Sequence, residues 1–411
     1  MSFIYNFIIH CYCFAIWVVS LWNEKAAKWV GGRKDIFARM KEEIIPGDKI
    51  VWFHCASLGE FEQGRPVMEQ FRKNHPDFKI LLTFFSPSGY EIRKDYAGAD
   101  YIFYLPVDTK KNAEHFLKTV NPCMAVFVKY EYWYHYFNTL KNLQIPLLVI
   151  SAIFRKEQHF FQWYGGWFRN LLRKPAMFFV QDDESGRLLY NIGISNVVVS
   201  GDTRFDRVAD IAKNINDFHV IEKFKNNKLL LIAGSTWQKD EQLLMQWFKD
   251  SNNLKMIVTP HEIDNNRINA LCMSIPGKKG LKFSAATVEN VLTADFLIID
   301  SIGILSSVYR YGEVAYIGGG FGAGIHNILE ATVFGLPVLF GPNYHKSKEA
   351  VDLAELKAAF CVKDQQELNV QLYKLLDDKD GLQKFKREII AYMEKKKGAT
   401  NIIIKYIEES V

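Results

Sequence analysis

A glycine-rich turn followed by polar residues has the composition of a nucleotide site. The apolar run Glu313–Ile317 leads into five glycines within residues 318–324, and Asn327 and Glu330 follow. Glycine lets the backbone approach a ligand closely, and a helix starting after such a turn offers N–H groups to an anion. Asn327 and Glu330 are three residues apart, so one helix face would carry both. We expect a phosphate to meet the glycines and a ribose to meet Glu330.

Two other interpretations of this turn remain open. Residues 318–323 also fit G-x-G-x-x-A, the start of a dinucleotide-binding fold. That fold requires an acidic residue about twenty positions further on, and residues 335–340 contain none. The glycines could instead serve a purely structural turn.

Three charged residues follow apolar runs and are candidates for catalysis. Glu60 follows the run Lys49–Ala56, where a carboxylate can take a proton from an acceptor hydroxyl or can cap the next helix. Glu131 follows Met124–Val128 and could orient a base or be an exposed loop acid. Arg204 could grip a phosphate in a bidentate way, or form a salt bridge with Asp202 or Asp206.

Three further turns are expected to point at the same ligand. Gly234, Ser235 and Thr236 form a possible anion cradle, although Ser235 could simply be an N-cap. Pro260 and His261 end the next apolar run, and Asp300–Gly303 ends a later one.

The alternation of apolar runs with amphipathic segments predicts two parallel sheets covered by helices. The first sheet is expected at 49–56, 79–85, 101–105, 124–128, 147–151, 177–180 and 197–200, and the second at 228–234, 254–259, 296–300, 314–318 and 337–341. The boundary is expected near Thr203–Asn227. A last helix, Gly381–Glu409, is expected to pack back on the first domain. Two such halves facing each other would leave a cleft at the carboxyl ends of their strands.

The N-terminal segment predicts contact with a membrane. Ser2–Trp22 is nearly continuously apolar, is close to the length of a bilayer core, and is followed by lysines and an arginine that favour a cytoplasmic flank. A buried or interfacial helix is the alternative. Aromatic and cationic residues interleave over Phe160–Lys174, which suits a lipid headgroup zone or core packing.

Composition favours a two-domain globular protein. A chain of 411 residues with 49% apolar content can form two domains, and the net charge of +5 gives no reason to expect nucleic-acid binding. Six scattered cysteines form no zinc motif, which favours a reducing compartment.

Taken together, these motifs resemble those of the 3-deoxy-D-manno-octulosonic acid (Kdo) transferase family of lipopolysaccharide synthesis. The resemblance covers nearly the whole chain and is carried by the N-terminal apolar segment and by residues 56–60, 129–133, 201–206, 234–236, 319–320 and 326–330. It implies a GT-B fold, that is, an α/β protein of two Rossmann-like doubly wound domains facing a central cleft. The implied parts are an anchor helix at 1–22, an acceptor-binding domain at 23–210, a donor-binding domain at 211–380 and a C-terminal helix at 381–411.

The resemblance also implies the reaction and its partners. The donor would be CMP-Kdo, the acceptor the lipid A precursor lipid IVA, and the mechanism inverting, without a metal or another cofactor. The protein would lie at the cytoplasmic face of the cell inner membrane.

Residue roles follow by position. Glu60 resembles the family's general base, and Glu131 and Arg204 match positions assigned to transition-state stabilisation. The implied CMP-Kdo contacts are Gly234, Ser235, Thr236, Pro260, His261, Ile302, Gly303, Ile304, Gly319, Gly320, Asn327, Ile328, Leu329 and Glu330.

The chain departs from the family pattern at four positions. Arginine replaces the usual lysine at 204, histidine an arginine at 261, isoleucine an acid at 304 and tryptophan a histidine at 237. The donor site is therefore expected to be altered but present. The rival hypotheses are a sugar-nucleotide epimerase, which needs no membrane anchor, and a membrane-tethered nucleotide-sugar binding protein, which does not need Glu60.

Overall fold

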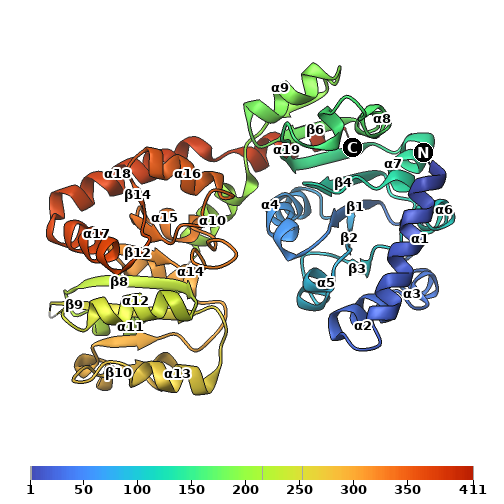
Figure 1. The fold of residues 1–411 in the computed structure, drawn as a ribbon. Helices are drawn as coiled ribbons and strands as arrows, with labels where there is room; N and C mark the ends of the chain where they lie inside the picture. The colour runs from blue at the N-terminus through green and yellow to red at the C-terminus, as the bar shows by residue number, and fades with distance from the viewer. Residues whose placement is uncertain (1, 215, 252, 411) are drawn as a thin grey trace. The chain divides into compact units, whose positions relative to one another are not determined.

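The computed structural model describes residues 2–214, 216–251 and 253–410. The chain divides into two compact units, Met1–Arg207 with Lys396–Val411, and Val208–Lys395 (Figure 1). Each unit is an α/β sandwich, in which helices cover both faces of one parallel sheet, as the alternating apolar pattern predicts.

In the part of the first unit that is described, seven parallel strands are ordered β3-β2-β1-β4-β5-β6-β7. Their bounds are β1 Ile50–Cys55, β2 Lys79–Phe84, β3 Tyr101–Tyr104, β4 Met124–Val128, β5 Leu147–Ala152, β6 Met177–Val180 and β7 Val197–Val199. The helices are α1 Ser2–Val19, α2 Glu24–Gly31, α3 Ile36–Glu43, α4 Leu58–Asn74, α5 Pro87–Arg93, α6 Lys110–Val120, α7 Tyr134–Asn142, α8 Gly166–Leu172, α9 Asp183–Asn191 and α19 Ala399–Glu408.

Strand β1 contributes side chains to the hydrophobic cores on both faces of the first sheet. Successive side chains of a strand point to opposite faces. Trp52 packs in the core on one face, and Val51 and Phe53 pack in the core on the other, which includes Ile403 of α19. Because both faces are covered, all six residues of β1 are buried.

Among the described residues of the second unit, the sheet order is β10-β11-β9-β8-β12-β13-β14. The strands are β8 Leu229–Thr236, β9 Leu254–Pro260, β10 Gly280–Lys282, β11 Phe296–Ile298, β12 Val314–Ile317, β13 Val338–Phe340 and β14 Ala359–Cys361. The main helices are α11 His219–Lys225, α12 Gln238–Phe248, α13 Asn265–Cys272, α14 Leu305–Val308, α15 Leu329–Thr332, α16 Lys348–Glu355, α17 Gln365–Asp377 and α18 Lys379–Lys396. Sequence patterns missed β10 and β14, because each has only three residues and lies at a sheet edge. Helix α10, Thr203–Lys213, contains the point where the chain passes from one unit to the other.

The C-terminal segment differs from the single helix expected at 381–409. It forms two helices, α18 and α19, separated near Gly398, whose φ of 109° ends the helical path. Asp206 fixes this break, because its carboxylate accepts hydrogen bonds from the backbone N–H groups of Gly398 and Thr400, both at 2.7 Å. Only α19 belongs to the first unit.

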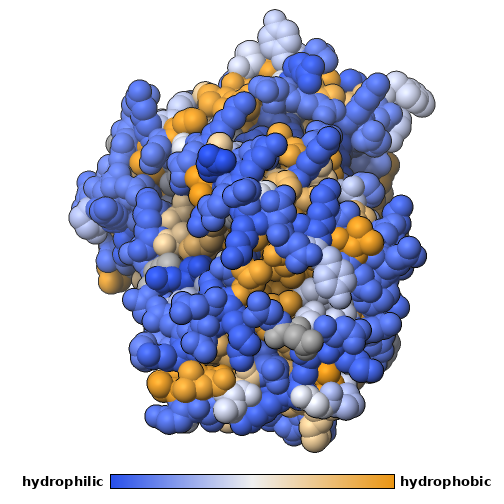
Figure 2. All heavy atoms as spheres, turned by 90° about the vertical axis from the view of Figure 1, so that its left-hand side faces the viewer, coloured by the Kyte–Doolittle hydropathy of each residue, from blue (hydrophilic) through white to orange (hydrophobic). Residues whose placement is uncertain are grey.

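Helix α1 is long and apolar enough to cross a membrane by length and composition, and 6% of it is buried. It ends at Val19, three residues before the limit expected from sequence. Its exposed apolar side chains include Phe3, Phe7, Phe14 and Trp17, each more than half exposed. The face in Figure 2 is different: hydrophilic residues predominate there, and hydrophobic residues form small separate groups.

Candidate active site

In the first unit, charged side chains gather at the carboxyl edge of the sheet. Glu60 follows β1, Glu131 follows β4, Arg155 follows β5 and Arg204 follows β7. Tyr130 connects several of them electrostatically. Burial and the charge of Glu60 raise the pKa of Tyr130, whereas the charges of Arg155 and Arg204 lower it. The three residues predicted to be catalytic therefore share one edge with Arg155, which sequence analysis missed although it lies four positions beyond a predicted strand.

Glu60 lies in the first turn of α4, whose N-cap is Ser57. The Ser57 hydroxyl donates a hydrogen bond to the Glu60 carboxylate, so the side chain is held near the strand end. Cys55, the last residue of β1, is fully buried. Burial raises the pKa of its thiol, and the nearby carboxylates of Glu60 and Glu131 raise it further. Both carboxylates thus lie close to the same strand end.

Glu131 is held by a hydrogen-bonded chain that reaches into the core. Trp133 Nε1 donates to Glu131 Oε2 at 2.8 Å, and His54 Nε2 lies 3.5 Å from the same oxygen. Thr83 Oγ1 accepts from Trp52 Nε1 at 2.8 Å and lies 2.9 Å from His54 Nδ1.

Trp133 joins this chain at two points. Its Nε1 donates to Glu131 and also lies 3.3 Å from Nε2 of His54, while Nδ1 of His54 lies against the Thr83 hydroxyl. Glu131 is therefore an oriented carboxylate with 16% of its side chain exposed, and not the exposed loop acid considered above.

Arg204 makes the salt bridge that sequence analysis left open, and its partner is Asp202. Its Nε and Nη2 donate to Asp202 Oδ2 at 2.9 and 2.7 Å, and its backbone N donates to Oδ1. The Arg204 side chain keeps 30% of its surface exposed, whereas Asp202 keeps 8%. The guanidinium is thus fixed from the protein side while part of it faces solvent.

Backbone geometry at the strand ends is unusual. Lys129, Ser151 and Ser235 have φ values of 69°, 51° and 52°, in the left-handed region that non-glycine residues rarely adopt. Ser151 and Ser235 also lie where the pairing register of β5 and β8 shifts. Such bulges and strained residues are concentrated next to functional sites, where they redirect the chain.

In the second unit, three rings stack at the corresponding edge. His261 lies between Trp237 and His326, with ring centroids 4.8 and 4.3 Å away. Trp237 Nε1 donates to His326 Nε2 at 3.1 Å. Burial and the neighbouring His261 lower the pKa of His326. The stack joins the end of β8, the end of β9 and the glycine turn after β12.

The glycine turn is tied down by Asp240, which sequence analysis did not identify. This buried carboxylate accepts hydrogen bonds from Gly319 N at 3.0 Å, from the Tyr316 hydroxyl at 2.8 Å and from Trp237 N at 2.9 Å. The N–H groups of four of the glycines have partners within the protein: 318, 319, 322 and 324. These N–H groups are therefore not available as a ready cradle for a phosphate.

Two of these glycines are required because backbone atoms of other segments lie very close to them. A Cβ at Gly318 would lie 2.2 Å from the carbonyl oxygen of Ser235, and one at Gly320 would lie 2.5 Å from the backbone nitrogen of Gly341. Neither position has room for a side chain. The structural interpretation of the turn thus accounts for these two residues.

The helix expected to carry Asn327 and Glu330 is shorter than predicted. Helix α15 starts at Leu329, so Asn327 lies before it and not on its face. The two side chains still meet, because Asn327 Nδ2 donates to Glu330 Oε1 at 3.1 Å, and Asn327 Oδ1 accepts from Leu329 N. The nearby charge of Glu330 also adds to the burial that raises the pKa of Tyr309.

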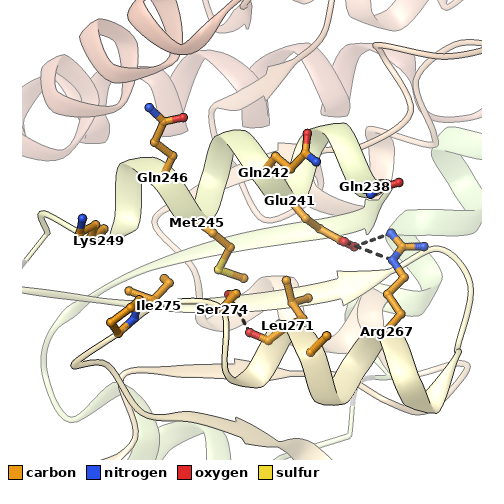
Figure 3. Close-up of a pocket in the computed structure, with 12 residues that line it drawn as sticks. Gln238, Glu241, Gln242, Met245, Gln246, Lys249, Arg267, Leu271, Ser274 and Ile275 are labelled. Carbon is orange, nitrogen blue, oxygen red and sulfur yellow. Dashed lines mark hydrogen bonds and ion pairs between the residues drawn. The ribbon is translucent and has the colours of Figure 1, made fainter.

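Ser235 is not an N-cap, because α12 starts at Gln238 with Trp237 as its N-cap. Thr236 is fully buried and its hydroxyl donates to Glu241 at 2.9 Å. Glu241 in turn pairs with Arg267 through two hydrogen bonds, of 2.7 and 3.2 Å. Figure 3 shows this pair at one end of a pocket of about 650 Å³ between α12 and α13. The lining of that pocket contains none of the residues predicted to bind the donor.

The remaining predicted donor residues differ in accessibility. Pro260, Ile328 and Leu329 are buried, so their side chains belong to the core. Gly234 is also buried, beside the hydroxyl of Tyr309. Ile302 is 91% exposed and Gly303 is exposed, while Ile304 is the half-buried N-cap of α14. Within the described ranges, no group of three His, Cys, Asp or Glu side chains lies together as a metal site would require.

Comparison with solved structures defines the fold. A UDP-GlcNAc 2-epimerase from Neisseria meningitidis superposes with a TM-score of 0.60 at 14% identity, covering 88% of this chain and 100% of that chain. A MurG protein from Acinetobacter baumannii superposes with a TM-score of 0.55 at 13% identity, covering 88% and 99%. At such identities the likeness shows the fold alone, which is GT-B.

Sequence comparison defines the enzyme class. Residues 31–207 match the family model of 3-deoxy-D-manno-octulosonic-acid transferase (kdotransferase). A transferase of that name from Aquifex aeolicus is 28% identical over 82% of this chain and 89% of its own length, and one from Chlamydophila psittaci is 25% identical over 91% and 89%. The chain is therefore a glycosyltransferase. More particularly, it carries the domain of the Kdo transferase family and is related to such transferases over most of its length.

Proposed function

We propose that the protein transfers Kdo from CMP-Kdo to lipid IVA, a lipid A precursor, with inversion at the anomeric carbon and at the cytoplasmic face of the inner membrane. The main support is the cluster at the carboxyl edge of the first sheet, where Glu60 and Glu131 lie beside two arginines. The family match supports the choice of sugar, and the apolar helix α1 supports a lipid acceptor.

In the proposed reaction, Glu60 takes the proton of an acceptor hydroxyl as its oxygen bonds to the anomeric carbon of Kdo. The bond from that carbon to the CMP phosphate breaks, and CMP leaves with the electron pair. Arg204 is already oriented by Asp202 and would offset negative charge on the phosphate, the kind of preorganised electrostatic term that contributes most to catalysis. No metal or cofactor takes part.

The proposed donor contacts are those listed from sequence, with their roles adjusted to the structure. Ser235, His261, Asn327 and Glu330 retain some surface for side-chain contact. Buried members such as Ile328 and Leu329 would contribute only backbone groups or shape.

Product mass spectrometry with CMP-Kdo and a tetraacylated acceptor tests the proposal. We expect the parent protein to add the mass of Kdo, and Glu60→Gln to lower turnover at least about a hundredfold, the usual scale for a general base. Glu62→Gln, which alters a carboxylate two residues away that pairs with Arg93, is the matched control and should keep most activity. Near-normal turnover of Glu60→Gln would exclude the assigned base, and an unmodified acceptor with the parent protein would refute the proposed reaction.

A further inference from the structure

A pocket of about 360 Å³ between α7 and α8 in the first unit has no role in the proposed reaction. Three of its residues, Tyr134, Asn138 and Lys141, are spaced four and three apart and so share one face of α7. The others lie on or just after α8: Trp167, Asn170, Leu171, Arg173 and Lys174.

The lining of this pocket suits a phosphate group. It contains three cations, Lys141, Arg173 and Lys174, and none of the described lining residues is acidic. Asn170 is oriented by Arg173, whose Nη1 lies 3.4 Å from the amide oxygen. Guanidinium and ammonium groups are the side chains that bind phosphate oxygens most strongly. The rings of Tyr134 and Trp167, stacked with centroids 4.9 Å apart, form an aromatic wall.

The same two rings connect the pocket to the apolar helix α1. The Tyr5 ring lies 5.3 Å from that of Tyr134 and 6.0 Å from that of Trp167. Tyr and Trp favour the level of lipid headgroups, where one part of the ring is apolar and another polar. The pocket thus adjoins α1, which exposes apolar side chains such as Phe3 and Phe7.

Helix α1 is bound to the first unit along one face. The Tyr5 hydroxyl donates to buried Asp108, and Asn6 Oδ1 lies 2.6 Å from His135 Nε2. Further along the helix, Tyr12 contacts Phe85 and Trp29. Crossing a bilayer upright would break these contacts. With its inner face fixed, α1 can meet a membrane only along its exposed apolar side.

We propose that the pocket binds the phosphate of an anionic phospholipid and so holds the first unit on the membrane, with α1 lying in the interface. The bound lipid is not the glycosyl acceptor. Helix α7 begins near the carboxyl edge of the sheet, and Lys141 lies seven residues further, about 10 Å along the helix axis. Arg173 and Lys174 precede β6, so the cations lie toward the edge opposite Glu60.

Cosedimentation of the full chain with vesicles tests this proposal. The pocket variant is Lys141→Gln/Arg173→Gln/Lys174→Gln, and the matched control is Lys374→Gln/Lys379→Gln/Arg387→Gln, which removes the same charges from exposed sites on α17 and α18. Vesicles of phosphatidylcholine with and without phosphatidylglycerol are compared. The parent and the control should prefer phosphatidylglycerol. The pocket variant should bind these vesicles about a hundredfold more weakly, because each of the three lost cations normally adds to binding at an anionic surface.

Three outcomes would overturn the proposal. Equal losses in the pocket and control variants would mean general attraction of a basic protein. Thermal stabilisation by inorganic phosphate that is lost in the pocket variant, with vesicle binding unchanged, would indicate a site for free phosphate. A raised KM for a detergent-dispersed acceptor with unchanged vesicle binding would indicate an acceptor site. If the triple variant does not fold, exposed Lys141→Gln alone should lower phosphatidylglycerol binding about fivefold, and no loss would refute the proposal.

Discussion

The carboxylate of Glu131 is oriented from behind by side chains that do not contact solvent. His54 and Thr83 are fully buried, and the polar atoms of both have partners within the protein. Buried polar chains of this kind are rigid when every member has a partner. The carboxylate is thus held in a fixed orientation, which suits a group that stabilises a transition state.

Replacing Trp133 by Phe tests this orientation. The ring would still pack on Phe85, whose centroid lies 4.7 Å away, but the 2.8 Å hydrogen bond to Glu131 would be lost. Hydrogen bonds to charged groups contribute about 1.5–3 kcal/mol, so we expect kcat to fall roughly ten- to hundredfold. KM for the donor should change little. An unchanged kcat would show that Trp133 does not position Glu131.

Glu330 is expected to bind the ribose of the proposed donor. Loss of a charged partner for the ribose hydroxyls should weaken CMP about ten- to hundredfold in Glu330→Ala, and most discrimination against 2′-deoxy-CMP should disappear. Calorimetric titration of both nucleotides measures this effect. Glu313→Ala is a useful control, because that carboxylate pairs with Lys225 at 2.6 Å and is not among the predicted donor contacts. A Glu330→Ala protein that still prefers CMP as strongly as the parent would refute the ribose assignment.

The sequence was sufficient to identify the candidate catalytic residues but not the side chains that bind to them. Glu60, Glu131 and Arg204 each follow a predicted strand, so their place at a sheet edge could be predicted. Their partners Asp202, Trp133 and His54 depend on rotamers and on strands far apart in sequence. Asp240 was missed because a helix-start acid usually interacts with its own helix, whereas this one also reaches Gly319.

Among the elements, all the long strands were predicted, whereas two of the three-residue strands were not. The first series of seven strands is present. Strands such as β1, β4 and β5 are buried along their whole length and read as continuous apolar sequence. Strands β10 and β14 have three residues each and were missed. The helix after the glycine turn begins later than predicted. The side chain of Asn327 accepts a hydrogen bond from Leu329 N, so Asn327 precedes α15 and is not part of it.

The stack of Trp237, His261 and His326 makes the second unit sensitive to pH. The pKa of His326 is lowered by burial and by His261, whereas in the unfolded chain it is about 6.5. As pH falls below about 6.5, the unfolded state binds a proton that the folded state resists, so stability should decrease. Protonation of His326 Nε2 would also remove the bond from Trp237.

Thermal melting between pH 5 and pH 8 checks this prediction. The parent should melt at a lower temperature on the acid side, and His326→Asn should reduce that dependence. His219→Asn, which removes an exposed histidine of the same unit, is the control and should leave it unchanged. Identical pH profiles for the parent and His326→Asn would contradict the prediction.

At the scale of the molecule, α1 is part of the first unit, and we also propose that it contacts the membrane. Deleting Met1–Trp22 should leave CMP binding intact, because all predicted donor contacts lie in the second unit. It should also lower the melting temperature, because buried Asp108 would lose its bond from Tyr5 and keep only those from the N–H groups of His135 and Tyr136.

A surface variant separates these two roles of α1. Phe3→Ser/Phe7→Ser/Phe14→Ser changes only exposed side chains and should abolish vesicle binding while keeping the parent melting temperature. Calorimetry, nucleotide titration and cosedimentation measure the three properties. Loss of CMP binding in a folded truncation would contradict the assignment of the donor site to the second unit.

The path of the chain also determines when the first unit can finish folding. The second unit, Val208–Lys395, is inserted between most of the first unit and its last helix. Ile403, Ile404 and Ile407 of α19 are buried in the core beside α4. On the ribosome, the part of that core beside α4 stays uncovered until nearly two hundred further residues have been translated. During this interval, the apolar surface that α19 will cover is open to aggregation.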